Sequence, residues 1–143
     1  MDKTTGRLEA RDYDVTSPKP ESLDIGINPP WRIALIIQSV QVELIIDLER
    51  ILVIGRAALD SPVQLDIDLG PFEAEKLGVS RRHLSLGREG SNVVIVDNRS
   101  SNGTILNGQK LTPNQSYVVH HGDELMLGLL KIKIAFLIHP LLR

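Results

Sequence analysis

Short apolar runs separated by polar turns make up the chain from Trp31 onward. Runs of this kind, rich in β-branched residues, are typical of strands. In the run near the C-terminal end, Lys131 and Lys133 alternate with Ile132 and Ile134, which predicts a strand with one buried face. The pattern therefore indicates many short strands rather than helices.

The individual strands can be placed from the same pattern. They are expected at 33–38, 42–48, 50–55, 83–86, 92–97, 104–106, 117–120, 124–127 and 131–138. A helical turn is expected only at 72–77. Asn107-Gly108, between apolar flanks, predicts a tight hairpin because both residues accept a positive φ. Strands this short and this numerous predict an all-β sandwich.

The first part of the chain differs from the rest. Residues 1–30 are polar, rich in proline, and show neither a helical nor an alternating pattern. We expect residues 1–30 to form a flexible N-terminal tail, residues 31–140 to form the folded domain and residues 141–143 to be a short C-terminal end.

Composition narrows the classes of function. The 143 residues are 42% apolar, enough for one packed core, and the net charge is −2. That balance excludes a globally basic nucleic-acid binder, and an aromatic content of 3% leaves too few rings for base stacking. The chain has no cysteine, so disulfides, thiolate metal sites and a cysteine nucleophile are excluded. No apolar run is long enough to span a membrane and the first residues do not resemble a signal peptide, so we expect a cytoplasmic protein.

Hydrogen-bond donors are concentrated in three turns. The first is Gly55-Arg56, the second is Ser80-Arg81-Arg82-His83, and the third is the segment 98–104, Asn-Arg-Ser-Ser-Asn-Gly-Thr. Together they offer guanidinium groups, hydroxyls, a side-chain amide and backbone N–H groups opened by glycine. These groups bind a phosphate dianion, with bidentate bonds from Arg and short neutral donors around them.

The order of these motifs resembles the forkhead-associated (FHA) domain family. The matching residues are Gly55-Arg56, Ser80-Arg81-Arg82-His83, Ser101-Asn102-Gly103-Thr104, Asn107-Gly108 and Gly122-Asp123. The resemblance covers residues 31–140, the whole expected domain. It implies a β-sandwich of about eleven strands whose loops at one end bind phosphothreonine peptides without a cofactor.

The resemblance also implies roles for individual residues. Arg56 and Ser80 would contact the phosphate oxygens, and Arg81 would add a further phosphate contact. Ser101 would contact the phosphate or the peptide, and Asn102 would hold the peptide main chain beside the phosphothreonine.

Five other residues would support this site. Gly55 ends the strand before the first turn, and His83 would brace the loop that precedes it. Gly103 would permit the third turn, and Asn107 and Gly108 would shape the hairpin behind the site.

The segment 60–79 departs from the family pattern because it is long and ends in an acidic and apolar stretch. In the family this loop borders the peptide groove. Glu73 and Glu75 would either exclude acidic partners or face water, and we expect them to face water. The preference for the residue three positions after the phosphothreonine is therefore not determined by the sequence.

Catalysis and metal binding are the rival interpretations. Ser80 and His83 with Asp97 or Asp123 could form a hydrolase triad, but no Gly-x-Ser-x-Gly motif accompanies them. His120-His121 could bind a metal, but adjacent residues on a strand point to opposite faces. We therefore expect neither an enzyme nor a metal site.

The sequence thus predicts an adaptor that reads phosphothreonine downstream of a Ser/Thr kinase. Its partners would be phosphothreonine-containing proteins, kinase substrates among them, and not nucleic acid or membranes. A phosphate-independent interaction domain on the same fold is the alternative. Two interpretations of the tail stay open: phosphorylation of Thr4 or Thr5 would let it bind its own domain and block other partners, or it is an unstructured leader whose threonines have no role.

Overall fold

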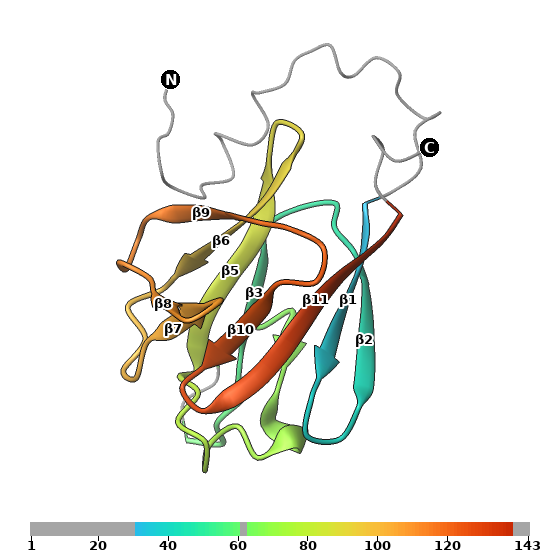
Figure 1. Ribbon diagram of the computed structural model, residues 1–143. Helices are drawn as coiled ribbons and strands as arrows, with labels where there is room; N and C mark the ends of the chain where they lie inside the picture. The colour runs from blue at the N-terminus through green and yellow to red at the C-terminus, as the bar shows by residue number, and fades with distance from the viewer. Residues whose placement is uncertain (1–30, 61–62, 139–143) are drawn as a thin grey trace.

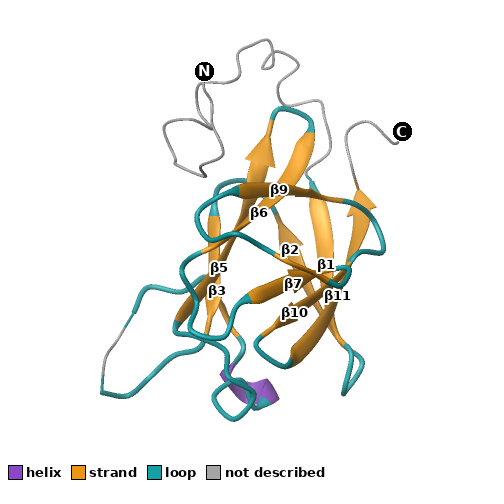
Figure 2. Cartoon of the chain, turned by 60° about the vertical axis from the view of Figure 1, so that its left-hand side comes forward, coloured by secondary structure: helices purple, strands orange, loops and turns teal. Residues whose placement is uncertain are grey.

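The computed structural model describes residues 31–60 and 63–138, which form two packed β-sheets (Figure 1 and Figure 2). The first sheet has six strands in the order β2-β1-β11-β10-β7-β8, and the second has five in the order β4-β3-β5-β6-β9. All neighbouring strands are antiparallel except β3 and β4, which are parallel. The all-β sandwich that the sequence predicts is confirmed.

The bounds of the strands follow the order of each sheet. The first sheet consists of β2 (Val42–Asp47), β1 (Arg32–Ile37), β11 (Leu130–Ile138), β10 (Glu124–Leu127), β7 (Thr104–Leu106) and β8 (Gln109–Lys110). The second sheet consists of β4 (Ile67–Asp68), β3 (Leu52–Gly55), β5 (Arg82–Glu89), β6 (Asn92–Asp97) and β9 (Ser116–Val119).

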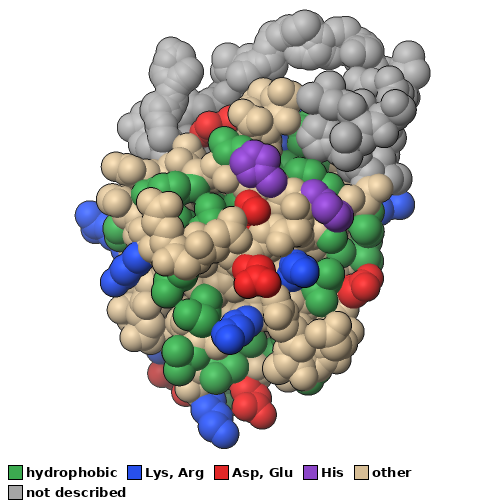
Figure 3. All heavy atoms as spheres, viewed as in Figure 1, with side chains coloured by type: hydrophobic (Ala, Val, Ile, Leu, Met, Phe, Trp, Pro, Cys, Tyr) green, Lys and Arg blue, Asp and Glu red, His purple; other side chains and the backbone are tan. Residues whose placement is uncertain are grey.

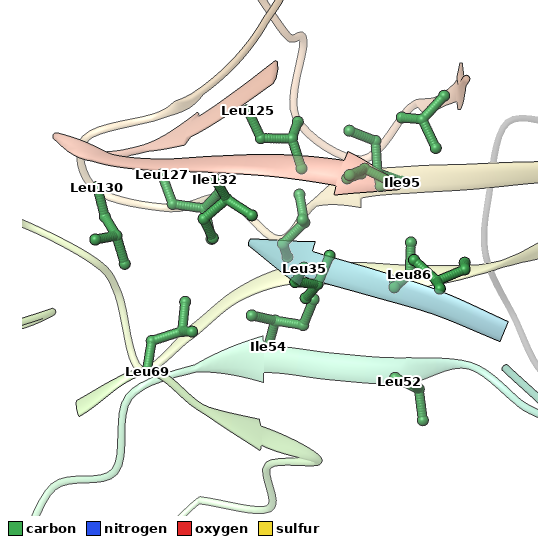
Figure 4. Close-up of a cluster of buried hydrophobic side chains, with 14 of the residues drawn as sticks. Leu35, Leu52, Ile54, Leu69, Leu86, Ile95, Leu125, Leu127, Leu130 and Ile132 are labelled. Carbon is green, nitrogen blue, oxygen red and sulfur yellow. The ribbon is translucent and has the colours of Figure 1, made fainter. Parts of the chain in front are cut away.

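Apolar side chains that alternate along the strands fill the space between the two sheets. In β11, Ile132 and Ile134 are buried while Lys131 and Lys133 are exposed, as the alternation predicts. The buried side chains labelled in Figure 4 include Leu35, Leu125 and Ile132 from the first sheet and Ile54, Leu86 and Ile95 from the second. A slip of one residue would turn a strand's apolar face to water, so this core fixes the register that positions the loops.

The sequence pattern places most strands correctly. The expected ranges 92–97, 104–106 and 124–127 coincide with β6, β7 and β10, and the other expected strands overlap observed ones. β5 extends further than the expected range 83–86 and reaches Glu89. The pattern does not predict β4 and β8, because strands of two residues are too short to show a period.

The helical turn expected at 72–77 is present only in part. A single turn of 3₁₀ helix, η1, occupies Gly70–Phe72, with Pro71 near its start. It ends at Glu73, whose φ of 64° is a left-handed conformation that no right-handed helix can include. Within the expected range, the backbone N–H of Leu77 donates to the carbonyl oxygen of Glu73 (3.0 Å), a single bond of the α-helical kind that is not continued into a helix.

The hairpin expected at Asn107-Gly108 is confirmed. It joins β7 to β8, and its two central residues have φ values of 49° and 87°. Positive φ at both positions matches the right-handed twist of the strands that the turn joins.

The structure bears on the domain limits in one respect. β1 begins at Arg32 and β11 ends at Ile138, so the sandwich lies inside the expected unit 31–140. The expected tail, residues 1–30, and the expected end, residues 141–143, lie outside the described residues, and both boundaries stay predictions. In the part of the chain that the structure describes, no helix has the length and apolar character needed to cross a membrane.

Candidate functional site

Three segments far apart in the sequence meet at one end of the second sheet, at the lower left in Figure 1. β3 and β6 both run antiparallel to β5, so the end of β3, the start of β5 and the end of β6 lie at the same end of the sheet. Arg56 follows β3, Ser80 and Arg81 precede β5, and Ser101 and Asn102 follow β6. The fold thus brings together the three donor-rich turns.

Arg56 is anchored by the segment that precedes β5. Its backbone N–H donates to the carbonyl oxygen of Arg81 (3.1 Å), and its Nε donates to the carbonyl oxygen of Val79 (2.6 Å). The half-buried side chain makes no other hydrogen bond or ion pair with the described residues. The Nε bond fixes the plane of the guanidinium group, and its two terminal nitrogens remain as donors for a ligand.

Gly55 permits this close approach of two backbone segments. A Cβ added at Gly55 would lie 1.8 Å from the carbonyl oxygen of Arg81. Any other residue would therefore push the end of β3 away from the segment that anchors Arg56.

A hydroxyl group joins the second turn to the third. The backbone N–H of Ser101 donates to Oγ of Ser80 (2.9 Å). Because Oγ is the acceptor in this bond, the hydroxyl hydrogen of Ser80 can be donated to a ligand. Ser80 is half-buried and Ser101 is exposed, so a ligand can reach both.

Asn102 is held by the loop that precedes the second turn. Its Nδ2 donates to the carbonyl oxygen of Gly78 (3.0 Å), and a Cβ added at Gly78 would lie 2.6 Å from that nitrogen. The side chain of Asn102 is exposed. With Nδ2 so oriented, its Oδ1 can accept a hydrogen bond from the backbone of a bound peptide.

The buried imidazole of His83 connects the second and third turns. Its Nδ1 accepts the backbone N–H of Ser80 (2.9 Å), and its Nε2 lies 3.0 Å from the carbonyl oxygen of Gly103. Because Nδ1 is an acceptor, the proton is assigned to Nε2, which donates to Gly103. Burial lowers the pKa of His83, and this effect is opposed by the bond to Gly103 and by the charge of Asp97. The neutral ring therefore holds both turns.

Asp97, the last residue of β6, organises the third turn. Its buried carboxylate accepts the backbone N–H of Ser100 (3.0 Å), the hydroxyl of Ser100 (2.6 Å) and the hydroxyl of Thr104 (2.6 Å). Oγ of Ser100 in turn accepts the backbone N–H of Gly103 (2.9 Å). The sequence pattern suggests Asp97 only as a member of a rejected triad. Its spacing to Ser100 is nonetheless typical of aspartates that bond back to the chain after them.

Two charged regions border the three turns. Nη2 of Arg81 lies 3.7 Å from Oδ1 of Asp60, and both side chains are solvent-accessible. Beside Arg56, an open depression of about 540 Å³ is lined by Arg56, Ala57, Gly70, Glu73, Glu75 and Lys76. Glu73 and Glu75 are exposed, in line with the expectation that they face water.

Charge of one sign does not dominate the surface in Figure 3, where basic and acidic side chains are interspersed. A phosphate group bound to such a surface has to be held by local donors rather than by a broad positive potential. The three turns supply donors of this kind: a guanidinium group, hydroxyls and an amide.

The hairpin of Asn107 contacts a neighbouring strand rather than the three turns. Nδ2 of Asn107 donates to Oδ1 of Asp123 (3.0 Å), and its Oδ1 accepts the backbone N–H of Glu124 (2.9 Å). These bonds tie the turn at Asn107-Gly108 to the start of β10.

The rival interpretations have no support in the geometry. Nδ1 of His83 accepts the backbone N–H of Ser80 and not its hydroxyl, so the two side chains do not form a nucleophile and base pair. Nδ1 of His121 accepts the backbone N–H of Phe136 (2.9 Å). Among the residues that the structure describes, no three His, Cys, Asp or Glu side chains are grouped so that they could hold a metal ion.

Comparison with known sequences matches this chain to one family. The family model described as "FHA domain" matches residues 52–128, more than half of the chain. The human protein "angiogenic factor with G patch and FHA domains 1" is 37% identical over 71 residues, which cover 46% of this chain and 10% of that protein. The chain therefore spans about a tenth of the length of this curated relative.

Comparison with solved structures leads to the same fold. The FHA domain of an Arabidopsis thaliana hypothetical protein is 26% identical with a TM-score of 0.62, over 78% of this chain and 90% of that one. The N-terminal FHA domain of S. cerevisiae Rad53p, solved in complex with a phosphothreonine peptide, is 25% identical with a TM-score of 0.56, over 73% of this chain and 93% of that one.

Proposed function

This chain belongs to the FHA domain family, and from that membership we propose that it binds phosphothreonine-containing segments of partner proteins. The observation that carries the proposal is the meeting of Arg56, Ser80 and Ser101 at one end of the second sheet. Ser101 is hydrogen-bonded to Ser80, and Arg56 is hydrogen-bonded to the residues on either side of Ser80. The Rad53p domain, whose structure contains a phosphothreonine peptide, supports the choice of ligand.

The chemistry of the three turns suits a phosphate group. A phosphothreonine carries a charge of about −1.5 to −2 at pH 7, with three acceptor oxygens. In the proposed complex the terminal nitrogens of Arg56 and the hydroxyl of Ser80 donate to these oxygens. Arg81 and Ser101 complete the shell. Asn102 holds the peptide main chain beside the phosphothreonine.

Calorimetry with matched peptides tests this proposal. The same peptide is titrated with threonine, phosphothreonine and phosphoserine at one position. We expect measurable binding only of the phosphorylated forms, and weaker binding below about pH 6, where the phosphate gains a second proton. Equal affinities for the phosphorylated and unphosphorylated peptides would instead support a phosphate-independent interaction domain on this fold.

The biological setting follows from the ligand. A protein that reads phosphothreonine acts downstream of a Ser/Thr kinase, so we propose a cytoplasmic signalling adaptor whose partners are kinase substrates. It would work by binding alone, because no step in the proposed function breaks a covalent bond.

A second part of the proposal concerns Thr4 and Thr5, which lie outside the described residues. Once phosphorylated, either threonine would bind the three turns of its own chain and exclude other ligands. About 25 residues separate Thr5 from Trp31, and a flexible linker of that length would have a root-mean-square end-to-end distance of roughly 25–30 Å. Its effective concentration would be on the order of 1 mM, enough to compete with a weak external ligand.

NMR can test the tail as a ligand. Phosphorylation of Thr4 or Thr5 in the full chain should shift the amide signals of Arg56, Ser80 and Asn102, and should weaken binding of an added phosphopeptide. Chains with both threonines replaced by alanine serve as the control. Unchanged signals after complete phosphorylation would exclude self-binding while leaving peptide recognition intact.

A further inference from the structure

The edges of the two sheets differ in length. The edge strands are β2 and β8 in the first sheet and β4 and β9 in the second. β4 and β8 have two residues each and β9 has four, whereas β2 has six. Within residues 31–60 and 63–138, no strand pairs with the outer edge of β2. β2 is therefore the longest edge in the described fold.

β2 lacks most of the features that usually protect such an edge. Proteins limit unwanted pairing with very short strands, prolines, charged side chains (lysine above all) or bulges. The sequence of β2, Val-Glu-Leu-Ile-Ile-Asp, contains no proline and no basic residue, and its charged residues are the acidic Glu43 and Asp47. It pairs with β1 in unbroken register from Val42 to Asp47. The backbone groups on its outer side are therefore regularly spaced for a further strand.

Exposed apolar side chains gather at the same edge. Ile45 is 53% exposed and Val42 is 37% exposed, and Val40 in the preceding turn is 54% exposed. Leu44 and Ile46, which point toward the core, are only partly buried. A strand added beside β2 would cover these side chains, and Figure 1 shows β2 at the right-hand edge, apart from the three turns at the lower left.

We propose that β2 pairs with β2 of a second copy of this chain, antiparallel about a two-fold axis. The first sheets of the two copies then form one continuous sheet. A second copy fits this edge because its strand offers the same apolar inner row and the same unprotected backbone. A two-fold contact uses the same surface on both partners and closes the assembly as a dimer.

The charges on β2 select one register for this pairing. Residues opposite each other in an antiparallel pair point to the same face, so the axis lies between the two copies of a single residue, which are opposite each other. The registers that pair most of the strand are centred on Leu44 or on Ile45. Centring on Ile45 would place Glu43 of each copy opposite Asp47 of the other, and like charges in this position are destabilising. Centring on Leu44 places Glu43 opposite Ile45 instead.

The register centred on Leu44 also continues the apolar inner row. Val42 of one copy then lies opposite Ile46 of the other, and the two Leu44 side chains lie opposite each other. Asp47 remains bonded to Arg32 on its own β1 through Nε (2.7 Å), so the pairing does not require that ion pair to break.

Charge changes at the exposed position 45 distinguish the two registers. In the Leu44-centred dimer, Ile45→Lys puts a lysine opposite Glu43 of the other copy at two places, and Ile45→Glu puts a glutamate there. In the Ile45-centred dimer residue 45 of one copy lies opposite residue 45 of the other, so either change places two like charges opposite each other. The sign of the effect of Ile45→Lys therefore reports the register.

Sedimentation equilibrium of the full chain measures these effects. We expect a reversible wild-type dimer, with a dimer Kd about three- to tenfold lower for Ile45→Lys and at least threefold higher for Ile45→Glu. Glu43→Lys combined with Ile45→Glu should lower the Kd about as much as Ile45→Lys does, because it makes the same ion pair with the charges exchanged. Leu137→Lys, at an exposed apolar position on β11, is the control and should leave the Kd unchanged.

Three results would contradict the proposed dimer or its register. A wild-type chain that stays monomeric up to about 500 μM, a weak affinity for a protein contact, would overturn the proposal. Weakening by both single variants, or no effect of either, would overturn the Leu44-centred pairing. Phosphopeptide affinity is measured separately on the same variants, so failure of peptide binding and failure of dimerisation cannot be confused.

Discussion

Arg56 combines two tasks in one side chain. Its Nε holds the carbonyl oxygen of Val79, and its terminal nitrogens are left for a ligand. The first bond orients the guanidinium group before any ligand arrives, which reduces the entropy lost on binding. Only arginine can do both, because its guanidinium group has Nε and two terminal nitrogens in one plane.

Replacing Arg56 should have the largest effect on binding. We expect Arg56→Ala to lower phosphopeptide affinity by about 2–4 kcal/mol, because phosphate oxygens lose charge-assisted bonds. Arg56→Lys should restore only part of this loss, since lysine cannot bond Val79 and phosphate with one planar group. Calorimetry of the variants measures the difference. Lys131→Ala, which removes an exposed positive charge on β11, is the matched control, and an equal loss there would point to general electrostatics.

His83 makes both stability and binding sensitive to pH. Burial lowers the pKa of the folded imidazole below its ordinary value of 6.5. As the pH falls through 6.5 the unfolded chain takes up the proton first, so the free energy of unfolding decreases until the pH reaches the lowered pKa of the folded state. Above 6.5 this contribution is fully present. Protonation in the folded state would also break the bond from the N–H of Ser80.

NMR titration of the ring nitrogens can check this behaviour. At pH 7 we expect the neutral tautomer of His83 with the proton on Nε2, and a titration midpoint below 6.5. A midpoint for His83 above 6.5 would contradict the assignment of the buried neutral ring.

Among the elements, the junction of β3 with the segment before β5 positions the site. Gly55 meets the backbone of Arg81 with no room for a side chain. After this junction the chain forms the short strand β4, which pairs with β3 in parallel, and then the turn η1. β4 could not be expected from the sequence pattern, because a two-residue strand is defined by its neighbour and not by a period.

Gly55→Ala should disturb this junction more than a glycine change elsewhere. We expect the free energy of unfolding to decrease by about 1–3 kcal/mol and phosphopeptide binding to weaken, because the added Cβ forces the two segments apart. Gly122→Ala is the comparison: its φ of 90° causes backbone strain, but no atom lies within 4 Å of the added Cβ. Denaturant unfolding and calorimetry measure both variants. Equal effects on binding would contradict the steric explanation.

For the molecule as a whole, the two sheets enclose one core and the three turns lie at one end of it. The sandwich runs from β1 at Arg32 to β11 at Ile138, whereas the family match covers only residues 52–128. β1, β2 and β11 thus lie outside the matched segment, and they form one side of the first sheet.

The expected boundary at residue 31 can be tested on the whole fold. A chain that begins at Trp31 should unfold in a single cooperative transition, with a midpoint close to that of the full chain, because β1 starts only after this residue. Thermal unfolding followed by circular dichroism measures the midpoint. A truncated chain that fails to fold would show that residues 1–30 belong to the domain.

What the sequence determined by itself was local. Alternating and β-branched runs specified the strands, since side chains on a strand point to opposite faces, and Asn107-Gly108 specified its hairpin through positive φ. The residue types of the three turns indicated phosphate chemistry, because donors and flexible backbone are properties of single residues.

The tertiary structure alone decided which of these groups meet. Arg56 finds Val79, and Ser101 finds Ser80, only because β3 and β6 pair on either side of β5. The burial of His83, which lets its ring join Ser80 to Gly103, likewise depends on the packing of the whole core. Strand order is set by packing of the whole core, an interaction between residues distant in the chain, and so it is not encoded in any one segment.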